Sequence, residues 1–111
     1  MNAATEQPAS WIDMGRDVDL ALALSEGRPT GPAADEVRRR LRSYIGQLVD
    51  PAEAYAKTLA DSRARYIVEQ TAEHARALLR DQGGDPATML RLLGKATYCL
   101  MRYVTCANSV A

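Results

Sequence analysis

The stretch from Asp85 to Ala107 most strongly constrains the fold, because it carries the longest amphipathic pattern in the chain. Asp85 followed by Pro86 is typical of an N-cap and the first position of a helix. At 100° per residue the apolar side chains fall on one line, made by Met89, Leu93, Ala96, Leu100, Val104 and Ala107. This pattern predicts a helix over residues 86–107, and its apolar arc is wide enough to contact several neighbours.

Composition favours an all-α protein around this helix. The 111 residues suit one domain, they include no Phe, and Arg outnumbers Lys 12 to 2. The abundance of Ala, Leu and Arg favours helices and is common in proteins from GC-rich genomes, which suggests an actinobacterial source. We therefore predict a flexible segment at residues 1–15 and a single domain at residues 16–111. The domain is expected to be a compact antiparallel bundle of four to five helices, at about 17–26, 35–49, 51–60, 62–81 and 86–107.

Glycine and proline indicate where these helices end. Residues 27–32 form a Pro- and Gly-containing linker, and Gly83-Gly84 ends the helix that precedes Asp85. Asp50-Pro51 predicts that one helix stops and another starts, with Asp50 as the cap and Glu53 completing a capping box. Beyond Ser62 the apolar face rotates by roughly 100°, so we also expect a break or kink at residues 60–62.

The charged residues are unevenly distributed although the net charge is zero. Residues 1–36 carry seven acids and two Arg, whereas a basic patch follows at Arg38, Arg39, Arg40 and Arg42. Nucleic-acid binding is not expected, because the helix after Pro51 is too acidic for a recognition helix. We expect the acidic N-terminal region to lie near the basic helices of its own chain or of a partner.

No residue pattern indicates a metal, a cofactor or a nucleophile. His74 is the only histidine, and Thr71 stands where a Glu-x-x-His signature needs an acid. Cys99 and Cys106 are about 10 Å apart along one helix, which is too far for a disulfide between them. We predict no metal and no cofactor. Free thiols and the absence of a secretory signal before Trp11 favour a cytoplasmic protein, and Arg91, Lys95 and Arg102 exclude a membrane span in the last helix.

The order of elements resembles a known family. A short Ala/Leu-rich helix and a Pro-containing linker precede Arg40-Leu41-Arg42-Ser43-Tyr44-Ile45-Gly46-Gln47-Leu48, which is followed by Glu73-His74-Ala75-Arg76-Ala77-Leu78 and a Leu/Arg-rich final helix. Over about residues 16–104 this resembles a family of small Streptomyces proteins, a domain of unknown function often labelled natural product biosynthesis proteins. The resemblance implies a genomic setting and brings no active site with it.

Two functions are compatible with these features. The wide apolar arc and the lack of reactive groups favour a non-catalytic helical accessory or interaction protein, forming a homodimer and binding a protein partner in actinobacterial specialised metabolism or its regulation. The alternative is a small helical enzyme or ligand-binding protein that holds an anionic metabolite with Arg and Tyr side chains. Its candidate site is the polar stripe of the last helix, Arg91, Lys95, Tyr98 and Arg102.

Overall fold

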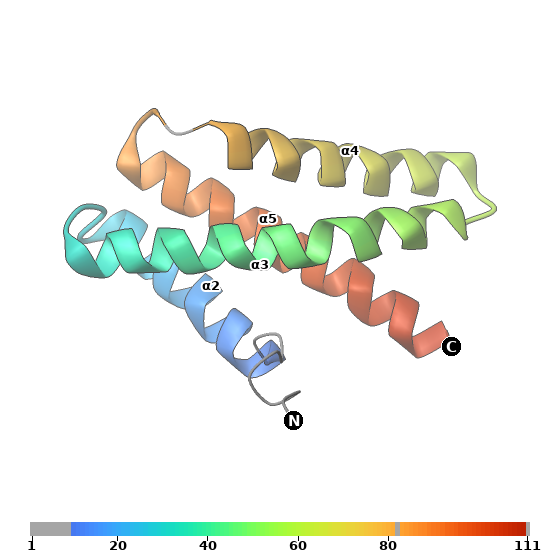
Figure 1. The fold of residues 1–111 in the computed structure, drawn as a ribbon, viewed down its shortest axis with the longest axis horizontal. Coiled ribbons are helices and arrows are strands. Elements are labelled where there is room, and N and C mark those ends of the chain that lie inside the picture. Colours follow the sequence, from blue (N-terminus) through green and yellow to red (C-terminus); the bar gives the residue numbers. More distant parts are fainter. Residues whose placement is uncertain (1–9, 82, 111) are drawn as a thin grey trace, which may run out of the picture.

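The computed structural model describes residues 10–81 and 83–110, with side chains up to residue 108. This part of the chain contains four helices and no strand: α2 (Trp11–Glu26), α3 (Pro32–Lys57), α4 (Ser62–Arg80) and α5 (Pro86–Val110). The predicted all-α class is therefore confirmed (Figure 1).

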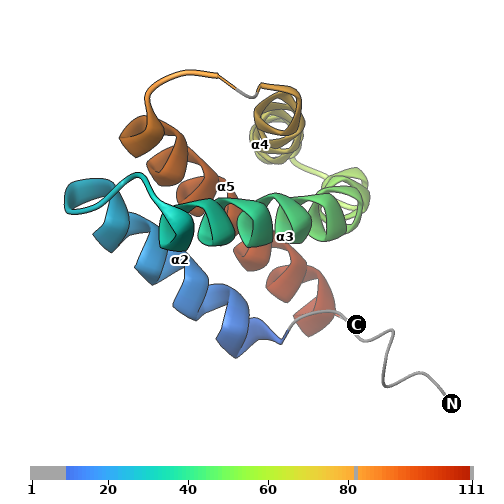
Figure 2. The ribbon, with the colours of Figure 1, turned by 60° about the vertical axis from the view of Figure 1, so that its left-hand side comes forward.

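The helices form two antiparallel pairs that cross each other. Helix α2 lies beside α5 and helix α3 beside α4, and in each pair the helices run in opposite directions (Figures 1 and 2). Helix α5 contacts all three other helices, whereas the described residues of α2 and α4 make no contact with each other. One side of α5, between α2 and α4 and away from α3, is therefore left open.

The core lies where α5 crosses α3. Leu90, Leu93 and Leu100 of α5 are fully buried, and so are Leu41 and Ile45 of α3. The predicted apolar line of the last helix is correct, since its Leu and Val members all contribute to this core. Thr97 is buried among them, and its hydroxyl donates a hydrogen bond of 2.8 Å to the Leu93 carbonyl, so burial of this hydroxyl leaves no polar group unsatisfied.

Capping side chains begin α4 and α5 as predicted. The Asp85 carboxylate accepts a hydrogen bond of 2.9 Å from the Thr88 N–H, and α5 starts at Pro86. The predicted break near residues 60–62 is also confirmed, because α3 ends at Lys57 and the Asp61 carboxylate accepts a bond of 3.2 Å from the Ala64 N–H. Within the described residues, none of the four helices has an apolar length sufficient to cross a bilayer.

The predicted boundary at Asp50-Pro51 is wrong, because α3 continues through Pro51. The helices expected at 35–49 and 51–60 are a single helix. Buried side chains on both sides of the proline, Val49 and Ala52, hold the backbone in helical register. Asp50 and Glu53 do not cap a helix; both carboxylates instead bind Arg76 of α4, at 2.9 and 2.8 Å. Burial of Val49 and Ala52 outweighs the local preference of proline for a helix start, because an ion pair to Asp50, whose side chain is 84% exposed, contributes little.

Two helices begin earlier than predicted. Helix α2 begins at Trp11 rather than at residue 17, because the Ser10 hydroxyl caps it by accepting a bond of 3.1 Å from the Asp13 N–H. Met14 is buried in the core, so residues 11–15 belong to the folded part and are not a flexible segment; residues 1–9 lie outside the described residues. Helix α3 begins at Pro32 rather than at residue 35, after Gly31 with φ of 103°, a conformation that glycine adopts at little cost.

Candidate functional site

The predicted polar stripe of the last helix lies on the open side of α5. Lys95, Tyr98 and Arg102 are exposed, Arg91 is half-buried, and none of the three cations makes an ion pair with a described residue. The Arg102 guanidinium lies 5.9 Å from the centroid of the Tyr98 ring, within the range of a cation–π interaction. The four side chains do not close around one cavity: Lys95 borders a hollow on the side of α4, whereas Tyr98 and Arg102 line a separate hollow of about 320 Å³ with Tyr103.

Part of this stripe borders a groove between α4 and α5, with a volume of about 380 Å³. We call it the α4–α5 groove. It is mainly apolar, with Leu78, Leu92 and Ala96 on its walls, while His74 and Lys95 supply polar groups. The remaining lining residues are Thr71, Ala77, Asp81 and Cys99. The sequence did not identify this groove, because its α4 side is defined only by how the two helices pack.

The groove is long enough to accept part of another helix. Leu92 and Cys99 both line it and are separated by seven residues, which is about 10 Å along a helix. Helices that dock in apolar grooves do so through side chains at positions i, i+3 or i+4, and i+7, which span the same length. Leu92 is 43% exposed and Ile67, on the preceding part of α4, is 50% exposed, so large apolar side chains remain accessible at this face.

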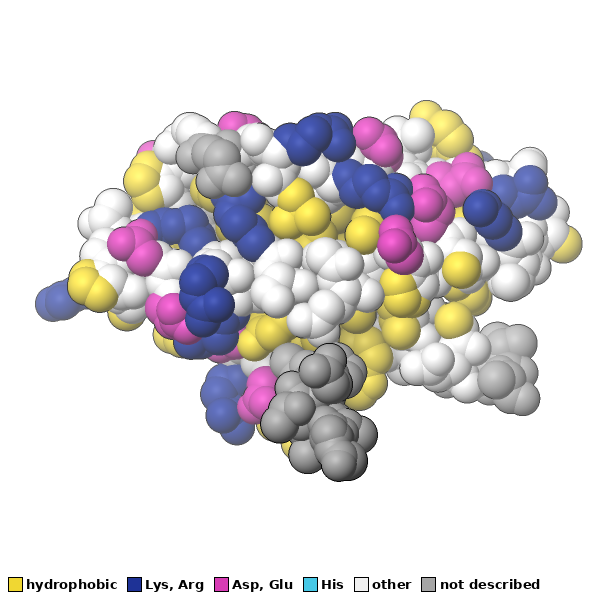
Figure 3. All heavy atoms as spheres, viewed as in Figure 1, with side chains coloured by type: hydrophobic (Ala, Val, Ile, Leu, Met, Phe, Trp, Pro, Cys, Tyr) yellow, Lys and Arg dark blue, Asp and Glu magenta, His cyan; other side chains and the backbone are white. Residues whose placement is uncertain are grey.

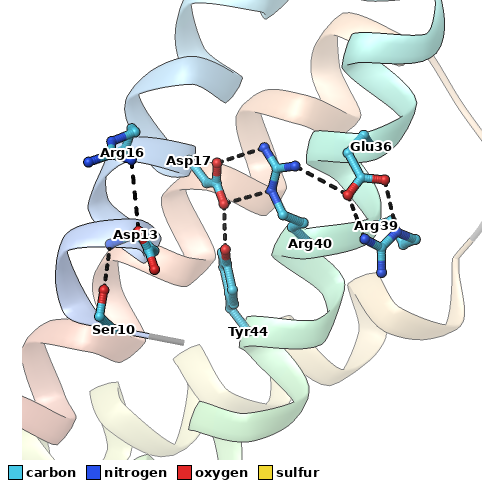
Figure 4. Close-up of polar contacts among 8 residues, drawn as sticks. All are labelled: Ser10, Asp13, Arg16, Asp17, Glu36, Arg39, Arg40 and Tyr44. Atoms are coloured by element: carbon cyan, nitrogen blue, oxygen red, sulfur yellow. Dashed lines mark hydrogen bonds and ion pairs between the residues drawn. The ribbon is translucent and has the colours of Figure 1, made fainter. Parts of the chain in front are cut away.

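The four arginines of the predicted basic patch all bind groups of their own chain. Arg40 crosses from α3 to α2 and donates two hydrogen bonds of 2.9 Å to the Asp17 carboxylate (Figure 4). Tyr44, one turn later on α3, also donates its hydroxyl proton to Asp17. The expectation that the acidic N-terminal region lies near the basic helices of its own chain is confirmed by this cluster, which we call the Asp17 cluster.

Burial and hydrogen bonding shift the pKa values of the Asp17 cluster. Burial alone raises the pKa of the Asp17 carboxyl, but the hydrogen bonds from Arg40 and Tyr44 outweigh it and leave the pKa below its ordinary value. Burial and the bond to Asp17 raise the pKa of Tyr44 to about 12. Asp17 is therefore ionised and Tyr44 protonated at neutral pH. Arg40 also donates a bond of 3.2 Å to Glu36 on its own helix, and the bonds from Arg40 and Tyr44 to Asp17 make the cluster a structural tie between α2 and α3.

The other arginines of the patch are also engaged. Arg38 binds Asp35 and donates a bond of 3.0 Å to the Pro29 carbonyl, while Arg39 binds Glu36. Arg42 reaches across to the end of α4, where it donates bonds of 2.7 Å to the Leu78 carbonyl and 3.2 Å to the Asp81 carbonyl. Figure 3 shows the face over α3 and α4, which carries both basic and acidic side chains.

Three of these arginines border a second hollow, of about 410 Å³, near the turn before α5. Arg38, Arg39 and Arg42 line it together with Asp35 and Gly84, whereas no arginine lines the α4–α5 groove. Because each guanidinium already has an acceptor, and because Asp35 adds a negative charge, an anion would have to compete with the protein's own groups.

No metal centre is formed in the described part of the chain. His74 is exposed, and no three His, Cys, Asp or Glu residues there gather closely enough to hold an ion. Both cysteines are free, Cys99 half-buried in the α4–α5 groove and Cys106 exposed. The prediction that they form no disulfide with each other is thus confirmed.

Comparison with known proteins places the chain in a family of unknown function. No curated protein and no solved structure matches the chain. Residues 13–109, which include all of α3 and α4 and nearly all of α2 and α5, match a family of unknown function, DUF6415. The chain belongs to this family of unknown function.

Proposed function

We propose that this protein is a non-catalytic, cytoplasmic accessory protein that forms a homodimer and binds a protein partner, in actinobacterial specialised metabolism or its regulation. The metabolic setting is supported by the resemblance of residues 16–104 to the Streptomyces family, and the cytoplasmic location by the two free cysteines. The observation that carries the proposal is the α4–α5 groove.

The occupant that suits this groove is an amphipathic helix of the partner. An apolar anchor of such a helix would lie between Leu78 of α4 and Leu92 of α5, where it would bury apolar surface of both. Lys95 at the edge would attract acidic side chains that flank the anchors. The Asp17 cluster, by contrast, has perturbed pKa values because the Arg40 guanidinium and the Tyr44 hydroxyl both donate to the Asp17 carboxylate, so these groups are engaged in holding α2 against α3.

The groove is tested by filling it. Ala96→Arg places a long charged side chain inside, whereas Gln47→Arg adds the same charge on the exposed surface of α3 and serves as the matched control. The tagged protein is purified from its natural host and measured by native mass spectrometry. We expect wild type and Gln47→Arg to retain a second polypeptide in a fixed ratio, and Ala96→Arg to lose it.

A second readout locates the bound polypeptide. Cys99 lines the groove and Cys106 does not, so the retained partner should slow alkylation of Cys99 by N-ethylmaleimide more than that of Cys106. A polypeptide that survives Ala96→Arg, or purified protein that retains no polypeptide under these conditions, contradicts the proposal.

One observation favours the alternative function, binding or conversion of an anionic metabolite. It is the hollow lined by Arg38, Arg39 and Arg42, which supplies the guanidinium groups that such a ligand needs. In the same native spectra, a reproducible added mass of metabolite size would favour this alternative. Its loss in Arg42→Gln, with retention in Arg102→Gln, would assign the ligand to this hollow rather than to the α5 stripe.

A further inference from the structure

Helices α2 and α5 each present a stripe of exposed side chains on the same face of the molecule. Helix α2 directs Asp17 toward α3, where Arg40 and Tyr44 bind it. At 100° per residue, Asp19 and Glu26 lie about 200° and 180° round the helix from Asp17, so both are on the side away from α3. Ile12 is on that side too and is 73% exposed.

The stripe of α5 faces the same way. Leu93, Thr97 and Leu100 are fully buried against the rest of the molecule, and Lys95 lies about 200° from Leu93, among the exposed positions of the helix. The two helices touch at Gly94, where an added Cβ would be 3.5 Å from the Ala21 Cβ and 3.7 Å from the Val18 carbonyl oxygen. We call the surface that they share the outer α2–α5 face, consisting of Ile12, Asp19, Glu26, Arg91, Lys95, Tyr98 and Arg102.

The two halves of this face have opposite charge. Its α2 half carries Asp19 and Glu26, its α5 half carries Arg91, Lys95 and Arg102, and none of these five makes an ion pair with a described residue. The acids of α2 and the cations of α5 also lie at matching levels along the two helices. Contact at Gly94 places Lys95 level with Asp19, and because the helices are antiparallel (Figure 2), Arg91 lies toward Glu26.

A face of this kind is complementary to itself. Rotation by 180° about an axis along the seam between α2 and α5 would lay α2 of one copy over α5 of the other at the same level. Each acid would then face a cation, whereas contact of α5 with α5 would place like charges together at an energetic cost. Ile12 and Tyr98, which is 51% exposed, supply apolar surface between the charges.

We infer that a second copy of this chain docks on the outer α2–α5 face about this two-fold axis, with Asp19 and Glu26 of each copy facing Lys95 and Arg91 of the other. This inference rests on the homodimer of the proposed function and assigns its interface. The 16 residues of α2 give the face a length of about 24 Å, and two helices give it a width of about 20 Å. The total buried area is then near the lower limit for specific association, so the dimer is salt-sensitive and micromolar or weaker.

Charge reversal across the interface tests the inference. Sedimentation equilibrium of the full chain at about 100 μM and low salt should give a dimer, and about 0.5 M salt should weaken it at least several-fold. Lys95→Glu and Asp19→Lys, each alone, should be monomers. An equimolar mixture of the two variants should dimerise again, because in the mixed dimer both pairs regain opposite charges. A charge pair within one chain could not produce this result.

Matched variants distinguish the possible failures. Arg63→Glu makes the same change in charge at an exposed position of α4 and should leave the dimer intact, and Arg91→Glu with Glu26→Lys repeats the mixing experiment at a second pair. A wild-type dimer that survives Lys95→Glu and Arg91→Glu overturns this interface but not the proposed homodimer. A wild type that stays monomeric at low salt overturns both this interface and the proposed homodimer. Partner binding in the α4–α5 groove is tested separately by Ala96→Arg.

Discussion

The ion pair between Arg40 and Asp17 is the polar contact whose removal should most destabilise the fold. Replacement of Arg40 by Met keeps most of the side-chain volume but removes two hydrogen bonds of 2.9 Å to Asp17 and a third, of 3.2 Å, to Glu36. The Asp17 side chain is only 8% exposed, so its charge would be left buried with Tyr44 as its remaining side-chain donor. Loss of one partner from a buried ion pair costs about 3 to 5 kcal/mol.

The expected loss lies somewhat below that range. The Arg40 side chain is 34% exposed, so water can reach part of the vacated space and screen the carboxylate. We therefore expect Arg40→Met to lower the free energy of unfolding by about 2 to 4 kcal/mol. Urea denaturation followed by circular dichroism measures this loss as a lower midpoint with an unchanged slope. Arg39→Met, which removes an exposed arginine one residue earlier, is the control and should hardly move the midpoint.

A double-mutant cycle with Asp17→Asn separates the buried charge from other effects of the substitution. Asn has no charge to leave uncompensated, so Arg40→Met should cost about 2 kcal/mol less in the Asp17→Asn background than in the wild type. Equal costs in the two backgrounds, or a loss below about 1 kcal/mol in the wild type, would refute the assignment of the Asp17 cluster as a structural tie.

Four further predictions concern the core, helix α3 and the dependence of stability on pH. Leu93→Ala, at a fully buried position, should lower the free energy of unfolding by about 2 to 5 kcal/mol; a loss below about 1 kcal/mol in urea denaturation would place the core elsewhere. Pro51→Ala should raise it by about 1 to 3 kcal/mol, because the Gln47 carbonyl regains an N–H partner in an exposed part of α3, and a lower melting temperature would contradict this. The pKa of Tyr44 is raised to about 12, so its stabilising contribution is complete below about pH 10 and should be lost as the pH rises to about 12. The free energy of unfolding should fall by at most about 3 kcal/mol over this range, and Tyr44→Phe should remove this alkaline dependence. The contribution of Asp17 to stability depends on pH in the opposite direction, because its pKa is lowered. It is complete above about pH 4 and should be lost as the pH falls through the folded-state pKa. Asp17→Asn should abolish this loss in acid denaturation.

The sequence predicted those parts of the fold that depend on residues close together in the chain. The start of α5 follows from Asp85 and Pro86, and the break before α4 from Asp61, whose carboxylate caps that helix. The core positions of α5 follow from periodicity alone, because a helix buries whichever side carries its large apolar residues. Each of these features involves side chains within a few residues of one another.

Contacts between distant residues explain what the sequence did not predict. Asp50 and Pro51 form a convincing helix start, yet the Asp50 carboxylate binds Arg76, 26 residues later, and α3 continues. In the same way, the α4–α5 groove depends on the way Leu78 and Leu92 are brought together by packing, and no local pattern specifies that geometry. The outer α2–α5 face could not be predicted either, because it depends on how two helices are rotated relative to each other. The first residues of these helices, Trp11 and Pro86, are far apart in the chain.

The arginines illustrate why residue type alone is a weak guide to a site in this chain. Four of them lie within residues 38–42, a density typical of nucleic-acid or phosphate binding, but the planar guanidinium is also suited to joining helices through carboxylates and carbonyl oxygens. Arg40 and Arg42 do this, at Asp17 and at the end of α4. The three dispersed cations of α5 form no dense motif, yet they remain without an ion pair in the described part of the chain. Charge available for recognition is therefore better identified by the partners that a side chain lacks than by how closely basic residues cluster in the sequence.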